Sequence, residues 1–385
     1  MHTHHRSHFF FSHQLDKLKE GVYPLYIVHT IRGFVSSLIG FFVPIYFFKI
    51  GFSVLEILLF FAINYYFAMM FSLLAGGIGN KVGLKHTMII SLPLFLLYLI
   101  SIIFLEEHPS RLFFYSLAIF NAFISTFYWI PLHSLFARLS SDKKESNQVG
   151  TFISLRSLAS IIAPLLGGII SVVFGFHALF IISIIILIIP IIILLKTPDI
   201  RPHLNFSLSD LWAFTRQHLR LFLTIILDSF GKFSEEILWP LFVFLILRDT
   251  VAVGIVGSLV GVGIILFSLI IGRIVAHRNY WLVIKISAFM LASFWLLKAF
   301  ASEKITIYLF SFFAAIFIAM FSIPLTSHTY SLAKRNKNLD EFIVFKQFLV
   351  YFGCLLAVLL AILLVDKLNL SFTLTSLNYF IISLF

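Results

Sequence analysis

The chain has 385 residues, of which 60% are hydrophobic and only 12% are charged, and its mean hydropathy is +1.04. Soluble globular domains carry about 25% charged residues, so this composition excludes a soluble fold, a disordered chain and a disulfide scaffold. The net charge of +11 comes from basic residues scattered through the loops, without the interleaved aromatics of a phosphate-tracking surface. We therefore expect no nucleic-acid partner.

Polar breaks divide the sequence into twelve apolar segments, and a membrane-spanning helix needs roughly 20 apolar residues. Hydrocarbon offers no partner to exposed backbone groups, so these segments should be helices and not open strands. The sequence thus predicts an all-α membrane protein with twelve spans, near residues 22–48, 52–78, 86–105, 111–137, 148–174, 177–195, 220–247, 251–275, 280–300, 305–332, 341–365 and 370–385.

Loop charges predict the orientation of these spans. If the N-terminus is inside, the inside loops hold about three times as many Lys and Arg residues as the outside loops. We therefore expect both termini to be cytoplasmic in a cell membrane, with a cytosolic segment at residues 1–20. The outside loops would then contain Lys49, Arg111, Arg248, Lys298, Lys304 and Lys367.

The two halves of the chain resemble each other in sequence. Short matches recur in the same order, pairing Phe42-Val-Pro44 with Leu238-Trp-Pro240, Ile130-Pro131 with Ile323-Pro324, and Thr151–Arg156 with Glu341–Lys346. Such a repeat predicts two pseudo-symmetric six-helix bundles with a site between them. The expected bundles are residues 21–196 and 218–385, and a cytosolic linker at 197–217 joins them.

The loop after span two reads Gly-Gly-Ile-Gly-Asn-Lys-Val-Gly-Leu-Lys. It resembles the loop motif of the major facilitator superfamily, with Asn80 where that family usually has Asp. The resemblance extends over essentially the whole chain through span count, repeat and linker. It implies the major facilitator fold and a gating role for Gly76, Asn80, Lys81, Gly83 and Lys85.

Small residues recur along span five together with a proline. The pattern resembles the antiporter motif of the same superfamily, with Ala at two of its Gly positions, and in the family this motif accompanies proton-coupled export. Small residues four apart also let two helices pack closely, so a plain packing face is the alternative. The residues concerned are Gly150, Ala159, Ala163, Pro164, Gly167 and Gly168.

Charges within apolar spans are the first candidates for function, because an unpaired charge in hydrocarbon is costly. Span seven contains Asp228, Lys232, Glu235 and Glu236, which helical spacing places on adjoining faces. The repeat places Arg32 of span one opposite Asp228. We hypothesise that Glu235 or Glu236 exchanges a proton. Asp228, Lys232 and Arg32 would set the pKa of that carboxyl group.

A second set of polar and aromatic residues should line the central cavity. Arg156 and Lys346 are symmetry mates in spans five and eleven, where they would bind substrate or pin helices together. His133 and His328 should lie near the cytosolic ends and be solvated. The expected cavity residues are His29, Asn64, Tyr65, Asn121, Ser125, Tyr128, Trp129, Arg156, Trp239, Thr326 and Lys346.

No phosphate loop, Cys-x-x-Cys pair or His-Glu-x-x-His motif occurs, so we expect no enzyme activity, catalytic residue, cofactor or metal. The sequence predicts a monomeric secondary transporter that moves a small molecule by alternating access, with proton-coupled export as the favoured mode. Its partners would be the substrate, the lipid bilayer, and protons or another coupling ion. The alternatives are a carrier for uptake of a sugar, amino acid or peptide, a lipid flippase, and a non-transporting receptor on the same fold.

Overall fold

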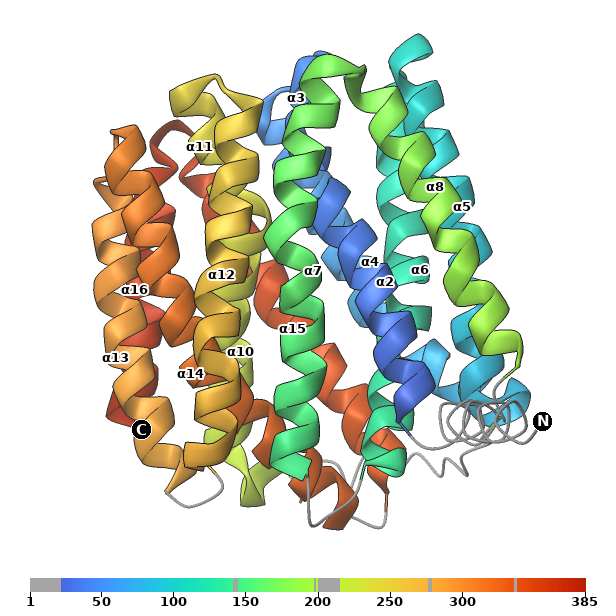
Figure 1. The fold of residues 1–385 in the computed structure, drawn as a ribbon, viewed down its shortest axis with the longest axis vertical. Coiled ribbons are helices and arrows are strands. Elements are labelled where there is room, and N and C mark those ends of the chain that lie inside the picture. The colour runs from blue at the N-terminus through green and yellow to red at the C-terminus, as the bar shows by residue number, and fades with distance from the viewer. Residues whose placement is uncertain (1–21, 141–144, 197–198, 200–214, 276–278, 336–337) are drawn as a thin grey trace, which may run out of the picture.

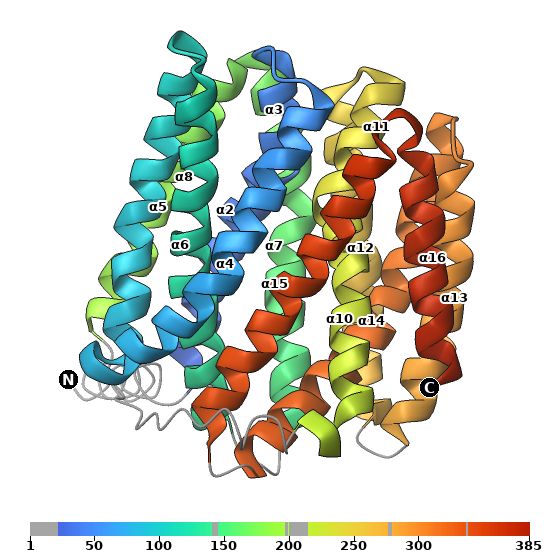
Figure 2. The same cartoon turned by 180° about the vertical axis from the view of Figure 1, so that it is seen from behind.

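The structure, a computed structural model, describes residues 22–140, 145–196, 199, 215–275, 279–335 and 338–385. The expected N-terminal segment and most of the expected linker lie outside these residues. Within them the chain forms helices and no strand, as the sequence predicts. Figures 1 and 2 show α2–α8 on one side of the molecule and α10–α16 on the other, so the two halves of the sequence form two groups of helices.

Within the described residues, each half contains six spans. The first half consists of α2 (Tyr23–Gly40) with α3 (Val43–Lys49), α4 (Val54–Val82), α5 (Leu84–Glu107), α6 (Arg111–Leu139), α7 (Glu145–Val173) and α8 (Gly175–Leu195). The second consists of α10 (Leu219–Phe233) with the π-helical turn η2 (Ser234–Leu238) and α11 (Trp239–Leu247), then α12 (Thr250–Val275), α13 (Tyr280–Ala299), α14 (Lys304–Arg335), α15 (Leu339–Leu363), the short turn η3 (Val365–Lys367) and α16 (Asn369–Leu384).

In the described part of the chain, ten spans are long and apolar enough to cross a membrane, one of which is α2 and α3 taken together. The other two are spans seven and twelve. Span seven is divided among α10, η2 and α11, the longest of which has 15 residues, and α16 has only 16 residues. Span seven is therefore not among the ten because it is divided into short helical pieces, and span twelve is not among them because its helix is short.

Spans one and seven are interrupted at matching positions. In each, a proline occupies the first turn of the second helical piece, Pro44 in α3 and Pro240 in α11. Proline has no backbone N–H to donate, so it is tolerated in the first turn of a helix but ends the helix before it. The prolines of the sequence repeat thus mark equivalent breaks in the two halves.

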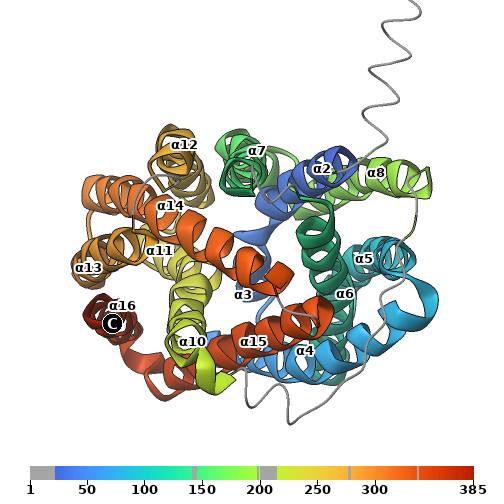
Figure 3. The same ribbon diagram turned by 90° about the horizontal axis from the view of Figure 1, so that it is seen from below.

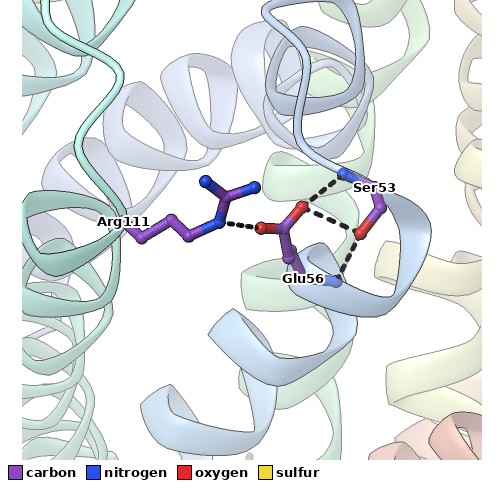
Figure 4. Close-up of polar contacts among 3 residues, drawn as sticks. All are labelled: Ser53, Glu56 and Arg111. Carbon is purple, nitrogen blue, oxygen red and sulfur yellow. Dashed lines mark hydrogen bonds and ion pairs between the residues drawn. The ribbon is translucent and has the colours of Figure 1, made fainter.

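The side of the molecule where α8 ends and α10 begins is called here the linker side, and it lies at the bottom of Figure 1. On the opposite side, Ser53 caps α4 (Figure 4). Its hydroxyl accepts from the N–H of Glu56, and the Glu56 carboxylate accepts from the N–H of Ser53 at 2.9 Å. The Nε of Arg111 lies 2.6 Å from that carboxylate, so the start of α6 is tied to the start of α4.

The two halves meet most extensively where α7 packs against α12. A Cβ on Gly254 would lie 2.5 Å from the carbonyl oxygen of Pro164, and one on Gly261 would lie 2.7 Å from the carbonyl carbon of Ser160. Gly168 of α7 faces the start of α12, while a Cβ on Gly167 would meet the carbonyl of Leu38 in α2 at 2.2 Å. Two of the small residues of span five thus allow close approach of neighbouring helices.

We expect Gly254→Ala and Gly261→Ala to lower stability by about 1–3 kcal/mol, because the added methyl would force α7 and α12 apart. Thermal unfolding of the purified protein in detergent measures this loss. Gly40→Ala is the matched control, since a Cβ there meets nothing within 4 Å. Equal unfolding temperatures for all three variants would show that α7 and α12 do not need their close contact.

Candidate functional site

Two charged residues of span seven, Asp228 and Lys232, form an ion pair that faces the centre of the molecule. The Nζ of Lys232 lies 2.9 Å from Asp228 Oδ2, and the hydroxyl of Tyr379 in α16 donates to Asp228 Oδ1 at 3.0 Å. The Asp228 side chain is 7% exposed, whereas that of Lys232 is 44% exposed. Lys232 is also within electrostatic range of His133 in α6 and Lys346 in α15, so it faces both halves.

Glu235 does not join Lys232, although the sequence places it one helical turn away. Its carboxylate lies 2.7 Å from the Nζ of Lys298 in α13. The π-helical turn at Ser234–Leu238 holds an extra residue and changes the direction in which Glu235 points. Glu236, in contrast, is exposed and lies within range of Lys232 and of Tyr65 in α4.

The expected position of Lys298 in an outside loop is wrong. Helix α13 continues to Ala299, and the Lys298 side chain is 0% exposed. Its ammonium lies 4.2 Å from the ring centre of Trp295 and 4.9 Å from that of Trp239. The pair with Glu235 is therefore enclosed within the second half.

Arg32 does not lie beside the acidic residues of span seven either. Its guanidinium carbon lies 4.0 Å from the ring centre of Tyr128 and 4.5 Å from that of Phe95, and Nη1 donates to the hydroxyl of Ser36. The rings hold it inside the first half, within electrostatic range of Arg156. The structure thus separates the five expected proton-coupling residues into three places.

The first half contains a narrow cleft between α2, α6 and α7. Four of the expected cavity residues line it: His29, Tyr128, Trp129 and Arg156. Arg32, Gly33 and Ser36 complete its lining. The ring of His29 stacks on Phe152 at 3.9 Å, and the guanidinium carbon of Arg156 lies 5.3 Å from the ring centre of Trp129. Basic and aromatic groups are therefore concentrated on one wall of the molecular centre.

The other expected cavity residues are distributed differently. Asn64 donates to the carbonyl of Ala118 at 2.9 Å, and Trp239 donates to Ser311 at 3.0 Å, so both are buried inside single halves and tie their own helices together. Ser125 lies 3.4 Å from the hydroxyl of Tyr351, across the interface between the halves. Tyr65, Asn121, Thr326 and Lys346 are half-buried.

Polar contacts join the two halves on the linker side. Arg138 of α6 forms an ion pair with Asp340 of α15, with Nε and Oδ1 3.3 Å apart. Lys334 of α14 donates to the carbonyl of Ser140 at 2.8 Å. His133 shares a hydrogen bond with the hydroxyl of Tyr330, so His133 bridges the halves and is not simply solvated.

Other contacts join the halves on the opposite side. The ring centres of Phe48 in α3 and Phe244 in α11 lie 6.2 Å apart. Lys49 donates to the hydroxyl of Thr250 at 3.2 Å, and its ammonium lies 5.5 Å from the Phe244 ring centre. Contacts between the halves thus lie at both ends of the central region. Figure 3 shows the linker-side ends of α14 and α15 crossing toward α6.

A profile of the Major Facilitator Superfamily matches residues 25–338. The chain belongs to this superfamily. No curated protein matches it in sequence. Members of the superfamily are transporters. The twelve spans found in the described residues, arranged in two halves, are the fold expected for it.

Solved transporters have the same fold. The structure is similar to that of the Escherichia coli fucose:proton symporter FucP in its outward conformation, with a TM-score of 0.67, 14% identity, and coverage of 94% of this chain and 97% of that one. A variant of FucP gives a TM-score of 0.67 at 13% identity, covering 94% and 96% of the chains. The human organic anion transporter MFSD10 (TETRAN) gives 0.67 at 13% identity, covering 94% and 98%.

The superfamily loop motif coincides with the end of α4 and the turn into α5. Helix α4 extends to Val82, and Gly83 turns the chain with a φ of 103°. The carboxylate of Asp199, which follows α8, accepts from the N–H of Lys85 at 2.9 Å and pairs with His86. A carboxylate from outside the motif thus lies at the start of α5, where a negative charge is favourable.

Three contacts were not predicted from the sequence: Tyr379 with Asp228, Lys298 with Glu235, and Arg138 with Asp340. Tyr379 comes from span twelve and Lys298 from span nine, where a lone Tyr or terminal Lys in an apolar run gives no signal of a distant partner. The Arg138–Asp340 pair joins residues 202 positions apart. Among the described residues, no group of three His, Cys, Asp or Glu side chains could hold a metal ion.

We expect Lys298→Met to lower stability by about 3–5 kcal/mol, because Glu235 would lose its partner in a buried position. The double variant Lys298→Met/Glu235→Leu should recover most of this loss, and thermal unfolding in detergent checks both. Lys304→Met is the matched control, since Lys304 pairs with Asp249 at an exposed position and its loss should matter little. A double variant as unstable as the single one would contradict the role of the pair.

Proposed function

We propose that this chain is a proton-coupled secondary transporter that exports a small molecule across a cell membrane by alternating access. The observation that carries the proposal is the Asp228–Lys232 pair, in which a carboxylate inside a membrane span is bound by one lysine and by Tyr379. A charge in this position is costly and marks an ion or proton pathway in membrane proteins.

We propose Asp228 as the group that takes up and releases the proton during transport. Its carboxylate is enclosed, but the paired Lys232 extends into the centre, where water and substrate would enter. A proton on Asp228 would break the ion pair and free Lys232, which links protonation to a change in the contacts of α10. Glu236 is the second candidate for proton exchange. Glu235 is better explained by its pair with Lys298, so we assign it a structural role.

The contacts on the two sides supply the gates that alternating access needs. On the linker side they are mostly an ion pair and hydrogen bonds, and on the opposite side they are aromatic contacts and a Lys49–Thr250 hydrogen bond. Opening one set while the other stays closed would expose the centre to one side of the membrane. The glycine contacts between α7 and α12 leave no space between these helices, so we propose that they act as the axis of this rocking.

Export is the direction that the pattern of span five favours, because the small residues that resemble the antiporter motif lie in the tightly packed α7. The excess of Lys and Arg in linker-side loops supports cytoplasmic termini. Uptake is the second candidate direction, since the fold is shared with a fucose:proton symporter. Counterflow of substrate would distinguish either carrier from a receptor that binds without transport.

We expect Asp228→Asn to abolish stimulation of flux by a pH gradient while leaving exchange at equilibrium, because the amide cannot take up and release the proton. The measurement is flux in proteoliposomes, with ethidium, fluorescein and labelled fucose as cationic, anionic and neutral probes. Glu236→Gln and Glu235→Gln test the other two acids.

Asp366→Asn is the matched control for this experiment, because Asp366 is an exposed aspartate in η3 outside the spans. Its flux should respond to the pH gradient as in the unmodified protein. If all three amides in span seven keep the full response to the pH gradient, proton coupling through this span is wrong.

A further inference from the structure

The cleft in the first half carries positive charge without a carboxylate to balance it. Arg32 of α2 and Arg156 of α7 both line it, and none of its lining residues is acidic. The ion pairs among the described residues involve other side chains, and neither guanidinium has an acidic partner there. Two cations this close repel each other, so an anion between them would be favourable.

Three buried polar atoms of the cleft also lack hydrogen-bond partners. They are Nδ1 of His29, Nε of Arg32 and the hydroxyl of Tyr128, on side chains that are 3%, 6% and 1% exposed. A buried polar atom without a partner costs stability, and such atoms in a native protein call for an explanation. Here all three belong to one cleft, and a ligand with acceptor oxygens would satisfy the donors.

Aromatic rings fix the orientation of the arginines. The guanidinium of Arg32 lies between the rings of Tyr128 and Phe95, which cover its faces and leave its N–H edge to donate. Arg156 lies against Trp129, and a Cβ on Gly33 would approach its Cγ to 2.9 Å. Planar guanidinium groups bind carboxylates with two parallel hydrogen bonds, so this edge suits a carboxylate.

The surroundings of the arginines favour an apolar body on the anion. Trp129 forms one wall, and the stacked rings of His29 and Phe152 form another. His133, whose ring stacks on Trp129 in the same helix, is within electrostatic range of Arg156 and of Lys346 in α15, so a further basic side chain lies near this region. A flat hydrocarbon ring could lie on these walls while its charged group meets the arginines.

We propose that Arg32, Arg156, Tyr128 and His29 form the binding site for an aromatic carboxylate, which is the class of molecule this transporter carries. The transport part of this statement rests on the proposed function, whereas binding can be tested without flux. Entry of the ligand requires the narrow cleft to widen by movement of α2, α6 and α7 relative to one another, and separation of the halves would give the ligand access to it from the centre.

The experiment measures thermal stabilisation of the purified full chain by benzoate and naphthoate, their amides and the matching primary amines. The carboxylates should stabilise the protein, and the amides and amines of the same ring should not. Arg32→Gln and Arg156→Gln should each weaken naphthoate affinity by about tenfold to a hundredfold, the value of a charge-assisted hydrogen bond. Gly33→Ala should weaken it without removing a charge, because the methyl displaces the stem of Arg156.

Arg220→Gln is the matched control. Arg220 lies at the start of α10, and its guanidinium carbon is 3.7 Å from the ring centre of Trp281, outside the cleft. Naphthoate affinity should be unchanged in this variant. If one glutamine variant fails to fold, the other and Gly33→Ala carry the test.

Equal stabilisation by amides or amines, no stabilisation by either carboxylate, or unchanged affinity in the arginine variants would overturn the site. If instead the proposed transport function is wrong, the carboxylates should still bind in a way that depends on the arginines, but no probe should show flux in proteoliposomes. Flux of ethidium or fucose without carboxylate binding would instead leave transport standing and remove the anion site.

Discussion

The cost of a charge in a low-dielectric interior governs the arrangement of this protein. Each buried carboxylate of span seven has its own lysine, Lys232 for Asp228 and Lys298 for Glu235. Arg32 and Arg156 of the first half have aromatic rings instead, which stabilise a cation without neutralising it. The two halves therefore place opposite kinds of group at their shared centre, a lysine-paired acid in one and, in the part of the chain that the structure describes, cations without an acidic partner in the other.

Contacts between the halves are also of two kinds. Between α7 and α12 the backbones touch through glycines, and no side chain can rotate away to release them. At the two ends of the central region, side chains such as Arg138, Asp340 and Phe48 make the contacts, and each can break and reform by changing rotamer. A firm contact along the middle and reversible contacts at the ends are what rocking motion requires.

The π-helical turn in span seven connects these features. It lies between Asp228 and the proline break at Pro240, and its extra residue directs Glu235 toward α13 while Glu236 stays exposed. Without it, regular helical spacing would keep Glu235 near Lys232, and one lysine would serve three acids. A local change in helical repeat thus divides one charged cluster into two separate ion pairs.

The sequence by itself determined the spans, the division into halves and the matching positions of Pro44 and Pro240, because hydropathy and an internal repeat can be read along the chain, but it did not predict that the helices change geometry at these prolines. It also identified Arg32, Arg156, Asp228 and Lys232 as charges that need an explanation. The tertiary structure decided the partners of Asp228, Glu235 and Arg138, since Tyr379, Lys298 and Asp340 come from distant helices. Register, rotation and the π-helical turn fix those meetings, and no pattern of neighbouring residues encodes them.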